Sequence, residues 1–357
     1  YQEQCVVVKE RGGQVVGVFA EPADPLPISL SLQTRVANGL NLPCLDGARR
    51  HFVLTASSLL VLRTPSLFDQ LLSLCSSECF RPALQQFYHY YGTVEAAYLL
   101  LAFLSDPRSV GVKARVLALM SELNAIPNYD VAGAWADGAV VANSAWSHVF
   151  EGLIKGVSRG LMAYWNEKVV DAKCEHLLFP PSLYHATLQY CAALIGFVVD
   201  VYHEALLPTP PSFPHDEWKT KELEGVRLLY FLLLRAVQAI KLFLYVDSIG
   251  LASVLALLPA ATRTQLAGAS FAQLLNSPQG TRLLKQVVNA VLLFYRNNPL
   301  AVVYEVCDKL AGFCAGYFSL GEKLFNQGFL GLQRLAEDAY HVDERELRSL
   351  LDTVAVA

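Results

Sequence analysis

The spacing of the apolar residues changes at Pro65-Ser-Leu-Phe-Asp-Gln-Leu-Leu-Ser-Leu-Cys75. Before this stretch, β-branched and apolar residues form short runs with a period of two, which is typical of strands. From this stretch onward, apolar side chains recur about every 3.6 residues, which is the period of a helix, and the spacing does not change back. We therefore expect a mainly α protein, an irregular α-helical solenoid that follows a short β segment.

The first 65 residues have the composition of a β domain. Short runs rich in β-branched residues occur at 4–8, 14–20 and 51–63. Residues 21–50 contain four prolines and are expected to form a long irregular connection. Because an isolated hairpin is marginally stable in water, we expect the other strands of this domain to lie outside this sequence. The expected domains are residues 1–65, an incomplete β domain, and residues 66–357, the helical solenoid.

Helix starts and stops follow in close succession after the change of spacing. Ser66 can cap a first helix, and Pro82 suits the first turn of a second helix that ends at Gly92. Thr93 is expected to cap a third helix, which stops at Ser105-Asp106-Pro107. Helices joined by almost no loop must pack antiparallel, and such a hairpin is the unit of a solenoid.

A long helix is expected from Ser144 to Trp165. It carries Gly152, Gly156 and Gly160 at every fourth position, which permits a close approach of another backbone. Charged residues flank this glycine row, so tight packing in a soluble protein explains it better than a membrane dimer motif. Further helices are expected at 182–206, 217–246, 251–258, 263–276, 281–295, 300–316, 321–339 and 343–354.

The composition restricts the class of function. Of the 357 residues, 54% are hydrophobic and 17% are charged, so the helices are covered by neighbours or by partners. A formal charge of −4 with no basic stripe argues against direct nucleic-acid binding. The eight scattered cysteines are typical of buried thiols in a reducing compartment, not of a disulfide framework.

The most apolar stretch, residues 228–246, is nearly long enough to cross a bilayer. Arg235 and Lys241 interrupt it, and placing an arginine near the centre of a bilayer costs roughly 2.5–3.5 kcal/mol. We therefore expect a helix buried between neighbouring helices.

No motif in the sequence predicts catalysis. Gly316-Tyr-Phe-Ser-Leu-Gly321 is followed by Glu322, which would repel phosphate, so it is interpreted as a break between helices. Cys174, His176, His185 and Cys191 lack the paired spacing of zinc ligands, and no Gly-x-Ser-x-Gly nucleophile elbow occurs. We assign no catalytic, cofactor-binding or metal-binding residue, and we expect a protein that is not an enzyme.

Adjacent aromatic residues on the second helix are the candidate partner-binding residues. Because neighbouring residues on a helix cannot all face one core, some of them must point outward. They could pack against the β domain, or they could line a groove for a partner peptide. The candidates are Phe87, Tyr88, Tyr90 and Tyr91.

Several stretches carry a family likeness through their order and spacing. They are His51-Phe-Val-Leu-Thr55, Phe87-Tyr-His-Tyr-Tyr-Gly92-Thr-Val-Glu-Ala-Ala97, Val157-Ser-Arg-Gly-Leu-Met-Ala-Tyr-Trp165 with Val169-Val170, Phe271 with Leu274, Ser277, Gly280 and Val287-Val-Asn-Ala290, and Phe313-Cys314. Together they resemble the large inner-ring nucleoporins of the nucleoporin 155 and nucleoporin 170 type, over roughly residues 50–340. One departure is Arg63-Thr-Pro65, where the family has an Arg-Pro junction followed by Asp.

The resemblance implies a β-propeller followed by an α-solenoid, so that residues 1–65 would be the C-terminal strands of the propeller. It implies a structural scaffold without catalysis in the inner ring of the nuclear pore complex, at the nuclear envelope, which supports transport of protein and mRNA. The implied partners are linker nucleoporins of the Nup53/Nup35 and Nup98 types and other inner-ring scaffold nucleoporins. Membrane contact in this family is attributed to propeller loops, which lie mostly outside this sequence.

Two other classes of protein have related features. An α-solenoid coat or cargo adaptor outside the pore would use the same helical hairpins. An all-helical enzyme of the terpenoid-lyase type would need an Asp-rich metal motif, which this sequence lacks.

Overall fold

The structure of the chain is a computed structural model. It describes residues 15–20, 49–55, 59–64, 67–124, 147–208, 217–337 and 344–356. The run at residues 4–8, Ser66, Cys5 and Cys44 lie outside these residues, as does almost all of the predicted connection at 21–50.

Three short strands form one antiparallel sheet in the order β1-β2-β3: β1 is Val15–Ala20, β2 is Arg49–Thr55 and β3 is Leu59–Thr64. His51 pairs with Ala20 on one side and with Leu62 on the other. The run predicted at 51–63 is therefore a hairpin of two strands, and each strand follows its neighbour in both sequence and space.

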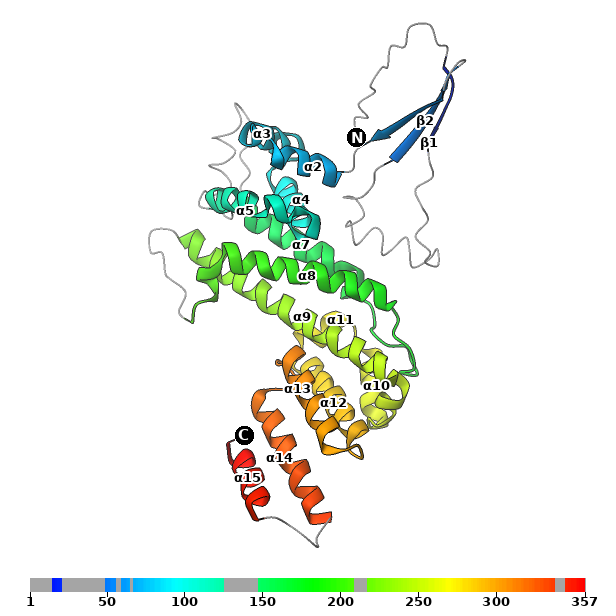
Figure 1. The fold of residues 1–357 in the computed structure, drawn as a ribbon, viewed down its shortest axis with the longest axis vertical. Helices are drawn as coiled ribbons and strands as arrows, with labels where there is room; N and C mark the ends of the chain where they lie inside the picture. Colours follow the sequence, from blue (N-terminus) through cyan, green and yellow to red (C-terminus); the bar gives the residue numbers. More distant parts are fainter. Residues whose placement is uncertain are drawn as a thin grey trace.

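The described helices stack one after another along the long axis of the molecule (Figure 1). This arrangement confirms the prediction of an irregular α-helical solenoid. The helices are α2 (Leu67–Ser76), α3 (Phe80–Tyr91), α4 (Thr93–Ser105), η2 (Pro107–Ser109), α5 (Val110–Asn124), α7 (His148–Trp165), α8 (Pro181–Val201), η3 (His203–Leu206), α9 (Glu217–Ala256), α10 (Ala260–Gly268), α11 (Phe271–Asn276), α12 (Pro278–Tyr295), α13 (Leu300–Phe313), α14 (Leu320–Glu337) and α15 (Glu344–Val356).

Two findings correct the sequence-based boundaries near the start of the solenoid. Helix α5 occupies a segment where no helix was predicted, and it buries Val116, Leu119 and Met120. Gly92, not Thr93, is the N-cap of α4, and it donates its backbone N–H to Tyr88 O of α3. Its φ of 79° lets a single residue join two helices, because glycine has no Cβ to clash in this conformation.

Two findings concern the helix boundaries in the second half of the chain. The label α9 covers two helices that meet at a kink at Gly250, whose φ of 109° and ψ of 83° are not helical, so the predicted separation of 217–246 from 251–258 is confirmed. The helix predicted at 263–276 is divided into α10 and α11, because Ser270 forms a capping box with Gln273 and starts a new helix there.

The glycine row of α7 lies at tight helix contacts, as the sequence predicts. A Cβ on Gly152 would lie 2.7 Å from Ala97 Cβ in α4, and one on Gly160 would lie 2.6 Å from Tyr190 in α8. At the same contact, Glu95 of α4 forms ion pairs with Lys155 and Arg159 of α7. Helix α7 therefore holds α4 and α8 at close range.

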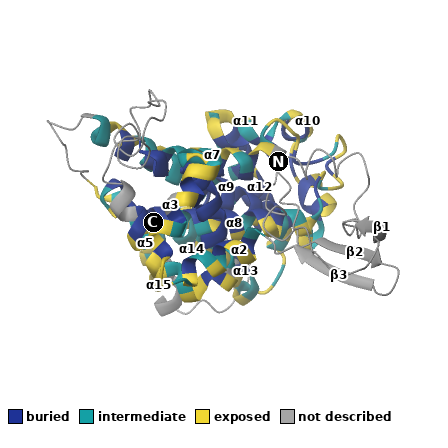
Figure 2. Cartoon of the chain, turned by 90° about the horizontal axis from the view of Figure 1, so that it is seen from above, coloured by how far each residue is buried: buried dark blue, intermediate teal, exposed yellow. Residues whose placement is uncertain are grey.

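Helix α9 is the central element of the array. It packs against α7, α8, α11, α12 and α13, and residues such as Leu233, Ile240 and Phe243 are fully buried. Helices α8 and α9 are long and apolar enough to cross a membrane, but these contacts explain the composition of α9 as that of a core helix. Buried residues form the interior from α2 onward, with exposed ones outside (Figure 2).

Candidate functional site

The aromatic residues of α3 divide between the core and the surface. Phe87 and Tyr88 are buried, and the ring of Tyr88 meets the ring of His148 in α7 edge to face at 5.5 Å. Tyr90 is 66% exposed, and Tyr91 is partly buried. Tyr91 lies between the others, with ring centroids 4.7 Å from Phe87 and 4.9 Å from Tyr90. Of the candidate residues, only Tyr90 and Tyr91 can meet a partner without opening the core.

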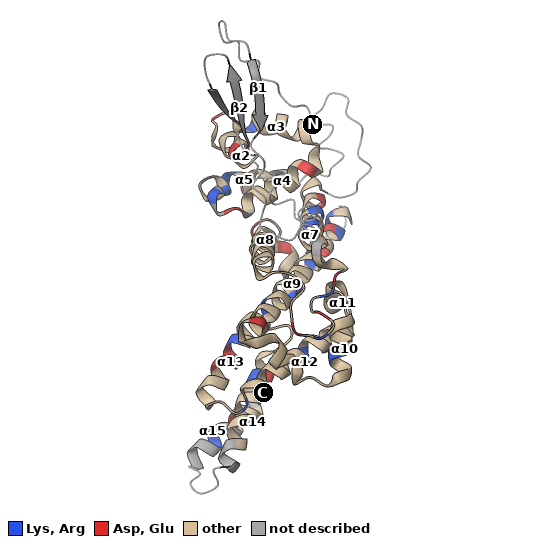
Figure 3. Ribbon diagram, turned by 90° about the vertical axis from the view of Figure 1, so that its right-hand side faces the viewer, with Lys and Arg blue, Asp and Glu red and all other residues tan. Residues whose placement is uncertain are grey.

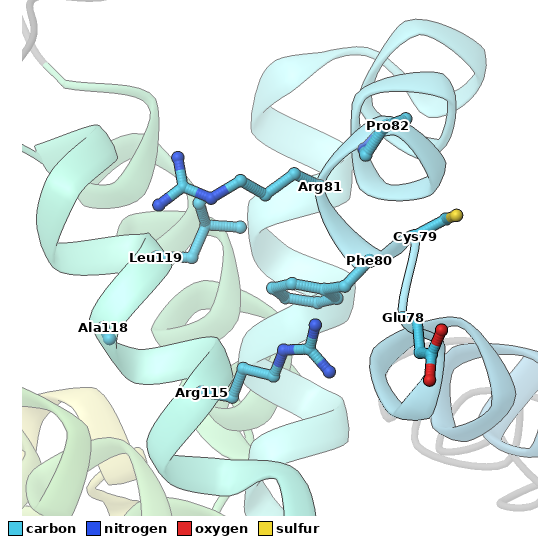
Figure 4. Close-up of a pocket in the computed structure, with 8 residues that line it drawn as sticks. All are labelled: Glu78, Cys79, Phe80, Arg81, Pro82, Arg115, Ala118 and Leu119. Atoms are coloured by element: carbon cyan, nitrogen blue, oxygen red, sulfur yellow. The ribbon is translucent and has the colours of Figure 1, made fainter.

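A pocket of about 560 Å³ lies at the other end of α3, beside α5 (Figure 4). Its apolar lining comes from Phe80 and Pro82 of α3 and from Ala118 and Leu119 of α5. Pockets that hold small ligands enclose about 300–1,000 Å³, so this one has room for two or three side chains of a partner.

Two arginines and one glutamate complete the lining. The Arg115 guanidinium lies over the Phe80 ring at 4.5 Å, and its Nη1 donates to the carbonyl oxygen of Cys75 at 3.3 Å. Arg81 reaches across the pocket toward Leu119, while Glu78 points away from Arg81 (Figure 4).

The lining includes one arginine without a carboxylate partner among the described residues. Arg115 forms no ion pair with any carboxylate in the described part of the chain, and this includes Glu78 in the same lining. Along the rest of the described helices, Lys and Arg are interspersed with Asp and Glu (Figure 3). Sequence reasoning missed this pocket because it assigned no helix to residues 110–124; the apolar repeat Val112, Val116, Leu119 was the available signal.

A second group of polar residues is closed to solvent. Glu222 of α9 is 2% exposed and accepts hydrogen bonds from Ser147 N and Ser147 Oγ, both at 2.7 Å, and from the Tyr202 hydroxyl at 3.1 Å. Burial raises the pKa of the Glu222 carboxyl above its ordinary value, and these hydrogen bonds oppose the rise. Ser147 and Tyr202 are buried as well, so the group joins α9 to the start of α7 and the end of α8.

No three Cys, His, Asp or Glu side chains converge on a possible metal position among the described residues. Cys174 donates its thiol to the carbonyl oxygen of Arg263, and Cys191 is buried in the core. Five of the six described cysteines are buried, and Cys79 is exposed.

No protein-family model matches the chain, and no curated protein sequence does so. Among solved structures, it is similar to Chaetomium thermophilum Nup170 SOL, with a TM-score of 0.59 and 20% identity over 81% of this chain. The fold is that of the Nup170 solenoid. A structure of the Chaetomium thermophilum Nup170 NTD-Nup53 complex matches 79% of this chain with a TM-score of 0.51 and 19% identity. The chain spans 37% and 39% of the length of these two Nup170 chains.

The likeness to Nup170 confirms at the level of fold the resemblance found in the sequence. Both solved structures belong to the nucleoporin type that the ordered motifs between residues 50 and 340 indicate.

Proposed function

We propose that this chain belongs to a structural scaffold nucleoporin of the nuclear pore complex, in the inner ring at the nuclear envelope, and that it has no catalytic role. The observation that carries the proposal is the match to Nup170 SOL over 81% of the chain. The ordered sequence motifs between residues 50 and 340 support it independently of the fold. In this role the chain supports nucleocytoplasmic transport of protein and mRNA.

The physical properties of the chain suit a scaffold. Each helix buries its apolar face against its neighbours in sequence, which gives a long body that can be extended by further hairpins. Such a body presents many grooves for short linear segments of flexible partners.

The proposed partners are linker nucleoporins of the Nup53/Nup35 type, in line with the solved Nup170 NTD-Nup53 complex, whose Nup170 chain shares this fold. Linkers of the Nup98 type and other inner-ring scaffold nucleoporins extend the proposal through the family resemblance. Tyr90 and Tyr91 are the proposed contact residues on α3, because they are accessible and pack against each other.

Residues 1–65 are proposed to be the C-terminal strands of a β-propeller, and residues 66–357 the solenoid. The antiparallel order β1-β2-β3 supports this, because propeller blades are antiparallel sheets in which neighbouring strands follow each other in sequence. If the division is right, residues 66–357 expressed alone melt cooperatively with the helical circular dichroism of the full chain. A non-cooperative melt would mean that the β segment is part of the solenoid core.

The scaffold proposal is tested by placing a fluorescent tag on the full-length protein that contains this chain, in cells of its source organism. We expect a nuclear rim that coincides with a pore marker, and co-purification of inner-ring components and a Nup53-type linker from nuclear-envelope extract. Localisation to cytoplasmic vesicles, with coat or cargo components in the eluate, would assign the chain to an adaptor outside the pore.

A further inference from the structure

We propose that the pocket between α3 and α5 binds an acidic linear peptide segment of another protein, one that carries an apolar side chain next to a carboxylate. The proposal extends the scaffold function proposed above, since it gives the chemistry of a captured segment. It requires only peptide capture, and it does not require a place in the nuclear pore.

The apolar part of the peptide fits the lining of the pocket. Phe80 is only 3% exposed and forms the inner wall, while the exposed Pro82 and the helix α5 residues Ala118 and Leu119 surround it. A cavity of about 560 Å³ accepts an aromatic or branched aliphatic side chain together with part of its neighbours. Burial of that side chain provides affinity that is independent of charge.

Arg115 selects the acidic part of the peptide. Its guanidinium is held against Phe80 and by the carbonyl oxygen of Cys75, so its position is fixed before a ligand arrives. No described carboxylate forms an ion pair with it, and a guanidinium binds a carboxylate through two parallel hydrogen bonds.

The N-terminus of α3 also favours a negatively charged group of the peptide. Its N-cap is Cys79, whose side chain gives no hydrogen bond to the helix. The N-terminus of a helix carries a partial positive charge, so a carboxylate in the pocket gains a further favourable interaction. Glu78 is the one acidic residue of the lining, and it opposes this preference.

A matched arginine shows what distinguishes Arg115. Arg108 in η2 also lies over a phenylalanine, with its guanidinium 3.9 Å from the centroid of Phe68. Unlike Arg115, Arg108 already forms an ion pair, in which its Nη2 lies 2.6 Å from Asp106 Oδ2. Arg108 therefore serves as the control for a stacked arginine that is not available to a ligand.

The test measures fluorescence anisotropy of short fluorescein-labelled peptides on the complete 357-residue chain. The peptides share a central Phe that is flanked by two Glu, two Gln or two Lys. We expect the Glu peptide to bind about tenfold more tightly than the Gln peptide, with the difference lost at high salt. Arg115→Gln should weaken the Glu peptide about tenfold, Glu78→Gln should strengthen it, and Arg108→Gln should leave it unchanged.

Arg81→Gln is the second variant, because Arg81 lines the same pocket and is exposed. Each variant is checked by thermal melting and by sedimentation velocity. Equal binding of the Glu and Gln peptides, or unchanged binding to a folded Arg115→Gln chain, would overturn the proposal. A change of oligomeric state in Arg115→Gln would also overturn it and assign the face to a second copy. Peptide binding without nuclear-rim localisation would reject the scaffold function and leave this inference intact.

Discussion

Tyr190 of α8 lies against Gly160 of α7 so closely that a Cβ on Gly160 would be 2.6 Å from Tyr190 Cε1. The Tyr190 hydroxyl donates to the carbonyl oxygen of Gly156 one turn earlier, at 3.2 Å. The tyrosine ring therefore occupies the space that two missing side chains leave on α7. Tyr190 is 3% exposed, so it has little room to move away.

Gly160→Ala should destabilise the chain by about 1–3 kcal/mol, because the added methyl group overlaps the buried Tyr190 ring. Gly196→Ala in α8 is the control, since a Cβ there meets no atom within 4 Å. This control should be neutral or stabilising by up to about 1 kcal/mol, because alanine favours a helix over glycine. Urea unfolding followed by circular dichroism gives both values, and equal effects would contradict the close contact.

Glu222→Ala should destabilise the chain by about 2–4 kcal/mol, because Ser147 and Tyr202 lose their buried acceptor. Glu222→Gln should have a smaller effect, since its amide oxygen can still accept one of these hydrogen bonds. The control is Glu224→Gln, an exposed site on the same helix, which should change the free energy of unfolding by less than about 0.5 kcal/mol. If Glu222→Ala lowered the free energy of unfolding no more than Glu224→Gln does, the group would not hold the three helices together.

Acid should destabilise the chain through His148. This residue is fully buried, its ring nitrogens have no hydrogen-bond partner in the described part of the chain, and burial lowers its pKa from 6.5 to about 4. The folded state therefore favours neutral histidine, so the stability from this residue is complete above pH 6.5 and is lost as the pH falls toward 4. The loss at pH 4 is about 3 kcal/mol.

His148→Phe removes this titration and keeps a ring against Tyr88, so the variant should lose less stability than the wild type on acidification. The raised pKa of Glu222 acts in the opposite direction: its contribution is complete below its ordinary pKa and is lost as the pH rises through the raised value. It is present in both chains and cancels in their difference. Parallel pH profiles for the two chains would contradict the assignment to His148.

Substitution of the α3 aromatics should separate stability from partner binding. Tyr90→Ala should change the free energy of unfolding by less than about 0.5 kcal/mol because Tyr90 is mostly exposed, whereas Tyr88→Ala should cost about 3–5 kcal/mol. The double variant Tyr90→Ala/Tyr91→Ala should weaken a Nup53-type linker fragment about tenfold, as expected for the loss of an aromatic anchor. Unchanged linker affinity in titration calorimetry, with an unchanged melting temperature, would remove these residues from the proposed contact.

Local signals in the sequence predicted most helices to within a few residues. Helices α12 and α14 begin within three residues of the predicted starts, because their apolar repeats are strong and their ends carry Pro, Ser or Gly. The break before Leu251 was predicted as well, and the non-helical backbone of Gly250 separates two helices there. For the candidate site, the sequence indicated that aromatics gather on α3, but not that Tyr88 faces inward and Tyr90 outward.

The sequence by itself determined the class of this protein, because the period of its apolar residues is a local property of the chain and requires burial on one face of successive helices. Only the tertiary structure decided where the side chain of Arg115 lies. Asp106 neutralises Arg108 from two positions earlier in the sequence, whereas Arg115 lines an open pocket beside Phe80 of another helix. The position of Arg115 depends on how α5 packs against α3, which is a contact between residues about 35 positions apart and leaves no periodic trace in the sequence.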